Sequence, residues 1–374
     1  MTFYERVGVL HIHTTYSDGT WHHRDLARLA NKMGLDFLVI TDHNVYAGEH
    51  EGWYGDTLLL VGEELHDPQA AAPENHLLAF GVGEELTLAG ADRPCSKAQA
   101  FIDAVRERGG LAYLAHPVEH SGDYALEPEI NWTAWDASGY DGLEIWNYMS
   151  EFKSYLSELG PTLLYSFFPK LAITGPFPET LHRWDALLAL RRVYAIGGVD
   201  AHGTVYRLGP LRRAVFSYAH LFRALTTHVL LEEPWSGQAA YDAALVYNAL
   251  RKGRAFVVYE ALGQGHGFRF SAQTRNEIYA MGDEFLATGS VRLHIRTPKS
   301  AHLRLLLNGY CIAETQGTEL IHESRAPGAY RAEAYRYFPF RKRMWIVSNP
   351  IFVRTPDRRR VEAAAAIRIG NMDC

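Results

Sequence analysis

Cysteine, excess positive charge and long apolar runs are all scarce or missing in this 374-residue chain. The cysteines are Cys95, Cys311 and Cys374, and no two of them form a C-x-x-C pair. Their odd number and wide spacing argue against a disulfide framework and indicate a reducing compartment. No run of about 18 apolar residues is present, and no apolar segment with a cleavage site follows Met1. We therefore expect a cytoplasmic protein without a membrane span.

The charge balance is acidic, because 43 Asp and Glu residues outnumber 37 Lys and Arg residues and give a formal net charge of -6. A protein that holds a long nucleic-acid backbone usually has a basic balance. Nucleic acid is therefore disfavoured as a partner, although a short oligonucleotide stays open. The length exceeds what one core usually supports, so two domains are expected.

Residues 1–262 alternate short apolar strands with amphipathic helices, a pattern that favours an α/β fold. The expected helices are His23–Met33, Ser96–Arg108 and Tyr241–Arg251. The expected strands are Val7–Leu10, Phe37–Ile40, Leu58–Val61, Leu77–Phe80, Leu111–Ala115, Gly142–Ile145, Ala195–Gly198 and Ala255–Tyr259. An insert at about 146–192 is rich in aromatic residues and proline. It is interpreted either as a lid or pocket wall or as an oligomer interface, so a homo-oligomer stays open.

The hydrophobic period changes to two beyond a glycine-rich linker at residues 262–267. Val291–Ile295 alternates in this way, and Asn308-Gly309 is a strong hairpin signal between two apolar segments. The pattern predicts a small all-β, immunoglobulin-like domain over residues 263–355. Residues 356–374 are expected to form a tail.

Six short motifs place imidazoles and carboxylates at the ends of the expected strands. They are His11-Ile12-His13 with Ser17-Asp18-Gly19, Thr41-Asp42-His43-Asn44, Gly62-Glu63-Glu64, His76-Leu77-Leu78, Ala115-His116-Pro117 and Asp200-Ala201-His202. Residues two apart in a strand share a face, so the imidazoles of the first motif can approach one ion. Any one motif is compatible with a structural role, but the repetition is not explained by core packing. Imidazole and carboxylate without thiolate suit manganese, iron or zinc.

In this order the motifs resemble the full motif set of the PHP (polymerase and histidinol phosphatase) family of metallohydrolases. The resemblance implies a distorted (β/α)7 TIM-like barrel over residues 1–262 and typically three metal ions. It assigns one ion to His11, His13, a bridging glutamate and Asp200, a second to that glutamate, His76 and His116, and a third to Asp18, His43 and His202.

Some positions of the motif set stay open or depart from the family pattern. Glu64 is the expected bridge, with Glu63 as the alternative. Asp42 is expected to orient a ligand, and the role of Glu144 is left open. Val199 departs from the family pattern, which usually has serine before the last aspartate.

These observations lead to the hypothesis of a metal-dependent phosphoesterase acting on a small phosphorylated substrate, either a phosphomonoester or a phosphodiester. Two to three divalent ions (Mn, Fe or Zn) would supply a metal-bound hydroxide that attacks phosphorus. His43 and His202 are candidates to assist the leaving oxygen if the third site is only partly occupied. Arg207 is the first candidate to bind the phosphate, and Arg183 is the second.

Three other hypotheses about the function stay open. One is a nuclease acting on short oligonucleotides, and another is a non-catalytic module in which metal only stabilises a binding domain. The third is amide hydrolysis by a related metal barrel. Phosphate release, oligonucleotide degradation and amine release distinguish them.

Overall fold

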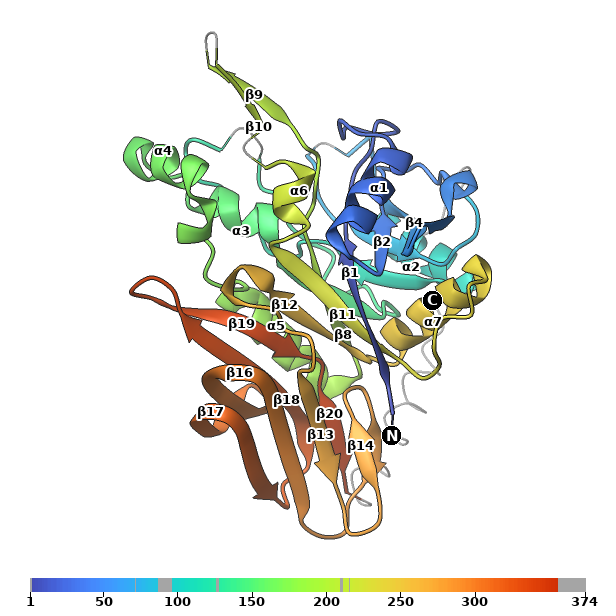
Figure 1. Cartoon of the computed structure of the whole chain (residues 1–374). Helices are drawn as coiled ribbons and strands as arrows, with labels where there is room; N and C mark the ends of the chain where they lie inside the picture. The colour runs from blue at the N-terminus through green and yellow to red at the C-terminus, as the bar shows by residue number, and fades with distance from the viewer. Residues whose placement is uncertain are drawn as a thin grey trace.

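The structure is a computed structural model that describes residues 2–70, 72–86, 96–125, 128–208, 211–214 and 216–355, with 205–208 and 211–214 described by their backbone. The predicted tail, residues 356–374, lies outside the described residues. Figure 1 shows a mixed α/β region that contains the N-terminal half, with the C-terminal strands gathered at one end of it. None of the described helices is long and apolar enough to span a membrane.

The α/β region follows the predicted order closely. Its strands are β1 (Tyr4–Leu10), β2 (Phe37–Ile40), β3 (Gly52–Tyr54), β4 (Thr57–Leu65), β5 (Leu77–Phe80), β6 (Leu111–Leu114), β7 (Gly142–Asn147), β8 (Tyr194–Gly198), β9 (Val205–Leu208), β10 (Leu211–Ala214), β11 (Leu225–Leu231) and β12 (Ala255–Tyr259). Its α-helices are α1 (His23–Met33), α2 (Lys97–Glu107), α3 (Tyr148–Ser154), α4 (Leu159–Phe167), α5 (Pro178–Leu190), α6 (Tyr218–Leu221) and α7 (Ala239–Arg251).

Local sequence explains where the helices begin and end. Helix α1 buries Leu26, Ala27 and Ala30 on one face, at helical spacing. It ends at Gly34, whose φ of 74° places it in the left-handed conformation that glycine adopts without strain. Helix α2 begins after Ser96, whose hydroxyl accepts the backbone N–H of Gln99.

The sheet of this region is mixed. Strands β1, β2 and β4 are parallel to one another, as are β6, β7 and β8, whereas β5 is antiparallel to both β4 and β6. Among the described residues between β4 and β5 there is no helix, and a parallel pair needs a long crossover, so the chain returns antiparallel at this point. A closed (β/α)7 barrel stays a prediction.

The strand ends are brought together by two isolated bridges. Ile12, just after β1, pairs with Ala201, just after β8, and His43 pairs with Glu64. Backbone hydrogen bonds from Val199 to Leu10 and from His13 to Ala201 extend the first contact. The polar residues at the ends of β1, β2, β4 and β8 therefore meet at one edge.

The C-terminal region is mostly antiparallel. It contains β13 (Arg269–Gln273), β14 (Ile278–Ala280), β15 (Glu284–Leu286), β16 (Val291–Leu307), β17 (Tyr310–Ser324), β18 (Gly328–Tyr337), β19 (Lys342–Ser348) and β20 (Ile351–Arg354). The predicted hairpin is confirmed, because Asn308 and Gly309 join β16 to β17 with φ values of 50° and 85°. The immunoglobulin-like topology stays a prediction.

The two regions share hydrogen-bonded structure. Strand β12 pairs with β19, and the buried side chain of Asn349 bonds both the N–H and the carbonyl of Ala195 and the carbonyl of Ala255. Arg331 on β18 forms a bidentate pair with Asp185 on α5 at 2.9 and 3.0 Å. The proposed division near residue 262 therefore falls between parts that are packed together.

The aromatic insert forms α3, α4 and α5. Phe152 and Trp184 are buried in the core. On and just after α4, by contrast, Leu159, Phe167 and Phe168 are 57%, 58% and 59% exposed. The choice between a pocket wall and an oligomer interface stays open.

Candidate metal centre

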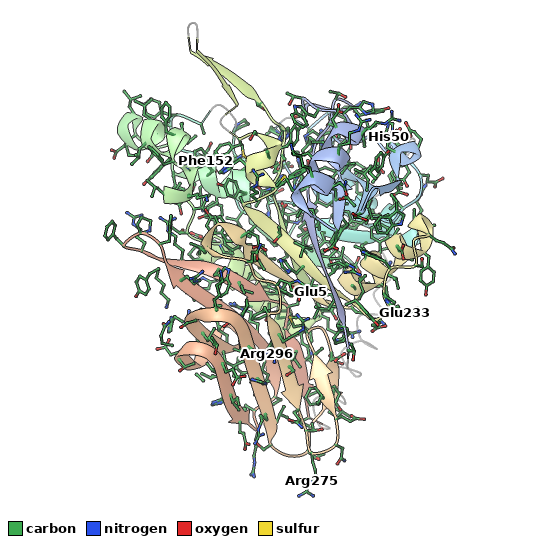
Figure 2. The ribbon with its side chains drawn as sticks, in the orientation of Figure 1. Glu5, His50, Phe152, Glu233, Arg275 and Arg296 are labelled. Atoms are coloured by element: carbon green, nitrogen blue, oxygen red, sulfur yellow. The ribbon has the colours of Figure 1, made fainter. Side chains whose placement is uncertain are left out.

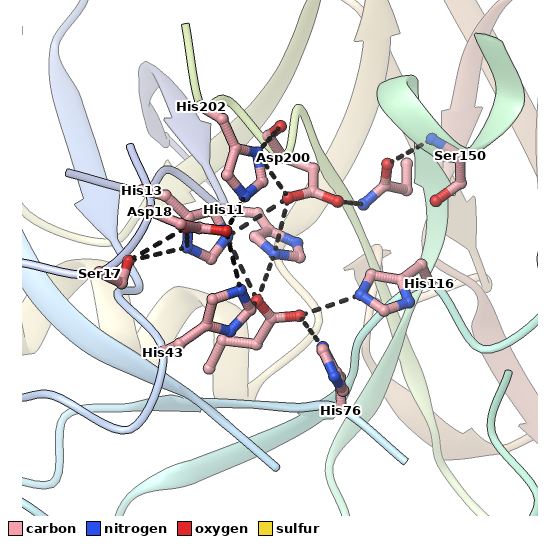
Figure 3. Close-up of polar contacts among 12 residues, drawn as sticks. His11, His13, Ser17, Asp18, His43, His76, His116, Ser150, Asp200 and His202 are labelled. Carbon is pink, nitrogen blue, oxygen red and sulfur yellow. Dashed lines mark hydrogen bonds and ion pairs between the residues drawn. The ribbon is translucent and has the colours of Figure 1, made fainter. Parts of the chain in front are cut away.

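A buried carboxylate with five imidazoles around it forms the middle of the site (Figure 3). Oε1 of Glu64 lies 2.8 Å from Nδ1 of His76 and 2.9 Å from Nε2 of His116. Its Oε2 lies 3.2 Å from Nε2 of His11 and of His13, and 3.1 Å from Nδ1 of His43. The two oxygens therefore face different groups of imidazoles, as a carboxylate that bridges two ions would.

Asp200 lies on the other side of the first pair of imidazoles. Its Oδ1 is 3.4 Å from Nε2 of His11 and 3.3 Å from Nε2 of His13. Asp18 forms the exposed rim with His202, whose Nε2 lies 3.3 Å from its Oδ2, and with His43 at 3.7 Å. All nine residues that the resemblance marks as ligands thus lie in one cluster, and their division among separate ions stays a prediction.

Glu64 rather than Glu63 faces the imidazoles. Neighbouring residues of a strand point to opposite faces, and on β4 the carboxylate of Glu63 turns away to accept the backbone N–H of Leu86 at 3.1 Å. Burial raises the pKa of Glu63 to about 8, so this carboxyl is protonated at neutral pH.

Backbone strain is concentrated at the same place. His11, His116 and Asp200 have positive φ values of 64°, 28° and 53°. Such conformations cost of order 1–3 kcal/mol each in a non-glycine residue and cluster at functional sites. Each of the three residues follows a strand, so the strained turn directs its side chain toward the cluster.

The donor set fits divalent metal ions. Nε2 of His11, Nε2 of His13 and Nδ1 of His43 are buried without a hydrogen-bond partner in the described structure. An unpartnered buried polar atom costs roughly 1–3 kcal/mol, a cost that coordination would remove. Six imidazoles and three carboxylates also match the ligand preference of zinc, manganese and iron.

The electrostatics show how strongly the three carboxylates attract positive charge. Burial alone would raise the pKa of Glu64, but the imidazoles of His11, His76 and His43 lower it far below its usual range. Burial opposes protonation of His13 as well, yet the nearby carboxylates of Asp200 and Glu64 raise its pKa to about 9. Metal ions would replace these protons, so metal binding releases protons and strengthens with pH.

Outer partners hold the ligands in place. Glu144 accepts a hydrogen bond from Nδ1 of His11 at 2.8 Å and from the backbone N–H of His116 at 2.8 Å, so it orients two ligands and does not face the ion positions itself. Asp42 accepts from the backbone and hydroxyl of Thr14 and from the Ser17 hydroxyl, at 2.6 to 2.7 Å. It thereby fixes the turn that carries Asp18.

Two arginines, Arg207 and Arg183, are the predicted phosphate-binding residues. The side chain of Arg207 lies outside the described residues. The guanidinium of Arg183 lies 4.2 Å from the centre of the Trp135 ring. A phosphate-binding role for either arginine stays a prediction.

Sequence reasoning missed His66. Its ring stacks on that of His76 at a centroid distance of 4.6 Å and lies 5.0 Å from that of His43. The available signal was its position two residues after Glu64, which places both on the same side of the extended chain.

No protein-family model matches the chain. DNA polymerase/3'-5' exonuclease PolX of Bacillus subtilis is 35% identical over 75 residues, which cover 20% of this chain and 13% of that protein. The uncharacterized protein MJ1587 of Methanocaldococcus jannaschii is 26% identical over 124 residues, and the match covers 29% of this chain and 66% of that protein. The chain thus spans less than two thirds of either relative.

Among solved structures, a two-domain protein from Bacteroides vulgatus containing a predicted PHP-like metal-dependent phosphoesterase aligns with 92% of this chain and 95% of its own, at 14% identity and a TM-score of 0.43. A candidate metal-dependent phosphoesterase from Bifidobacterium adolescentis aligns with 52% of this chain and 87% of its own, at 20% identity and a TM-score of 0.32.

Proposed function

We propose that this chain is a metal-dependent phosphoesterase that hydrolyses a small phosphomonoester or phosphodiester at the candidate metal centre. The observation that supports it most is the buried carboxylate of Glu64, whose two oxygens face five imidazoles at 2.8 to 3.2 Å. A stabilising core does not require this arrangement, whereas a polynuclear centre does.

Divalent ions bound there would lower the pKa of water and neutralise phosphate oxygens. The ligands would be His11, His13, Glu64 and Asp200 for one ion, Glu64, His76 and His116 for a second, and Asp18, His43 and His202 for a third. This division, the number of ions and their identity are parts of the proposal.

The protein's own residues provide an asymmetric site. The side chains of His11 and His13 are fully buried, whereas those of His43 and His202 are 24% and 21% exposed. The substrate therefore approaches from the rim formed by Asp18, His43 and His202. Where the third position holds no ion, His43 and His202 would be the candidates to assist a leaving oxygen there. Burial lowers the pKa of His43 to about 4, so its imidazole is neutral at neutral pH, the form that binds a metal ion.

The test is a metal and activity assay on the full-length protein. Metal content is measured by elemental analysis after reconstitution with Mn, Fe or Zn, and hydrolysis is followed with p-nitrophenyl phosphate and bis-p-nitrophenyl phosphate. His116→Ala should lose metal and lose activity by at least the roughly 10–100-fold that loss of an outer partner costs. His182→Ala, which alters an exposed imidazole on α5, is the matched control. One equivalent of metal or none, without release of p-nitrophenol from either ester, would contradict the proposal.

A nuclease is the second candidate, because the 75-residue match is to a polymerase with 3'-5' exonuclease activity. The net charge of -6 speaks against long nucleic acids. An end-labelled oligonucleotide in the same assay separates the two, since stepwise shortening without release from the small esters would favour the nuclease.

A further inference from the structure

A second group of imidazoles lies beside α1, outside the candidate metal centre. His22 is the N-cap of α1, His23 is its first residue, and His50 ends the 3-10 helix η1 (Gly48–His50). The ring centroids of His22, His23 and His50 lie 4.5 to 5.6 Å apart. One nitrogen from each ring lies within 4.8 Å of the other two. Figure 2 shows His50 at the periphery of the α/β region.

His23 has no evident structural reason to be polar. Its side chain is fully buried, and neither ring nitrogen has a hydrogen-bond partner in the described structure. An apolar side chain would avoid the penalty of roughly 1–3 kcal/mol for such a group. An imidazole in this state is explained if a ligand occupies one of its nitrogens.

The surroundings favour a cation over an anion. Nε2 of His23 lies 3.6 Å from the carboxylate of Asp42, and Nε2 of His50 lies 3.7 Å from that of Glu49. The two carboxylates offset the positive partial charge at the start of α1.

We propose that His22, His23 and His50 bind one transition-metal ion, with zinc as the best match, at a site separate from the candidate metal centre. Three imidazoles with a fourth open position are a common zinc ligand set. Nitrogens bound to one zinc at about 2.0–2.1 Å lie at most roughly 4.2 Å apart, so small rotations of the partly exposed rings of His22 and His50 complete the set.

The rest of the cluster is arranged as an outer layer. The hydroxyl of Tyr16 lies 2.9 Å from Nε2 of His50, and its ring packs edge-on against all three imidazoles. Asp42 can accept the free N–H of His23, the usual partnership of a metal-bound imidazole with a carboxylate. Asp42 also accepts hydrogen bonds from Thr14 and Ser17 in the turn that carries Asp18, so this one residue connects the proposed site to the candidate metal centre.

The experiment counts zinc bound to the full-length protein after metal removal, with Zn²⁺ as the probe, equilibrium dialysis and elemental analysis. The double variant His22→Ala/His50→Ala should bind one equivalent less than the wild type. His116→Ala should lose zinc from the other centre and keep this equivalent, so the losses should add in the triple variant. His182→Ala is the control for loss of an exposed imidazole.

Equal stoichiometry and affinity in the wild type and the double variant would overturn the proposal. Both substituted side chains are partly exposed and lie outside the core, so the core stays filled, and melting temperatures check this. If the double variant unfolds, His22→Gln/His50→Gln keeps side-chain size and hydrogen bonding, and the same loss of one equivalent is expected from it.

Discussion

Some residues of the candidate metal centre would bind the ions directly. Others hold these proposed ligands in position. Glu144 belongs to the second group, because it accepts from Nδ1 of His11, from the backbone of His116 and from Asn147, and its side chain is buried. The hydrogen bond to Nδ1 leaves Nε2 of His11 directed at Glu64 and Asp200. Its amide analogue has the same shape but only one acceptor oxygen.

Glu144→Gln is therefore expected to lower metal affinity or kcat about 10–100-fold while the protein stays folded. Zinc titration of the metal-free variant and its kcat and KM on an aryl phosphate measure this. Glu158→Gln, which changes an exposed carboxylate, is the control and should alter neither metal affinity nor kcat. Unchanged zinc affinity together with unchanged kcat would show that Glu144 does not position His11.

The sequence alone predicts candidate metal ligands where they belong to a short motif. His11, Asp18, His76 and Asp200 were all named from spacing and resemblance, and the structure places them in one cluster. Glu144 could not be assigned a role, because its partner His11 is 133 residues away and depends on how β7 meets β1. The imidazole cluster of His22, His23 and His50 was missed for the same reason, since it forms only when η1 folds against α1.

At the scale of elements, apolar runs predicted most strands but not their directions. Strand β11 was missed because it carries polar residues, among them Thr227, whose hydroxyl bonds both the N–H and the carbonyl of Gly197. The antiparallel pairing of β5 was also not foreseen, since it depends on a connection without a helix. Periodicity identifies a strand, whereas its neighbours are decided by tertiary contacts.

The end of β8 passes very close to the metal ligands. A methyl group added at Gly198 would overlap Oε1 of Glu144 and lie 2.8 Å from Cβ of His11. Glycine is therefore required there by close approach of the backbone to the site.

Gly198→Ala is expected to displace Glu144 and His11, to reduce metal content and to cost roughly 1–3 kcal/mol of stability through overpacking. Elemental analysis and thermal melting of the reconstituted variant test both effects. Gly160→Ala on α4 is a suitable control, because no heavy atom lies within 4 Å of its added methyl. Wild-type metal content in Gly198→Ala would show that the site tolerates the shift.

At the scale of the whole molecule, one buried carboxylate joins the first strand to the C-terminal region. Glu5 on β1 accepts from Nδ1 of His228 on β11 at 2.7 Å and from Arg269 on β13 at 2.6 Å. Figure 2 shows Glu5 near the middle of the molecule. Removing one partner from a buried charged group leaves the others uncompensated and typically costs 3–5 kcal/mol.

The pKa values of this group set a pH window for the effect. Burial would raise the pKa of Glu5, but hydrogen bonding and charge from His228 and then Arg269 lower it from 4.5 to about 2. This contribution to stability is complete above about 4.5 and is lost as the pH falls toward 2. Burial opposes protonation of His228, yet Glu260 and Glu5 raise its pKa above 6.5, so its contribution is complete below 6.5 and is lost at higher pH.

Glu5→Gln should therefore lower the melting temperature most between about pH 4.5 and 6.5, with a loss of stability on the order of 3 kcal/mol. The difference from the wild type should shrink as the pH falls below 4.5, because the wild-type carboxylate is then protonated in the unfolded chain. Loss of bound metal in acid affects both proteins and cancels in the difference. Glu232→Gln, which breaks an exposed pair with Lys252, should cost less than about 1 kcal/mol at every pH. A difference between Glu5→Gln and wild type that does not vary with pH would show that Glu5 acts through packing, and that charge does not hold β1 against the C-terminal region.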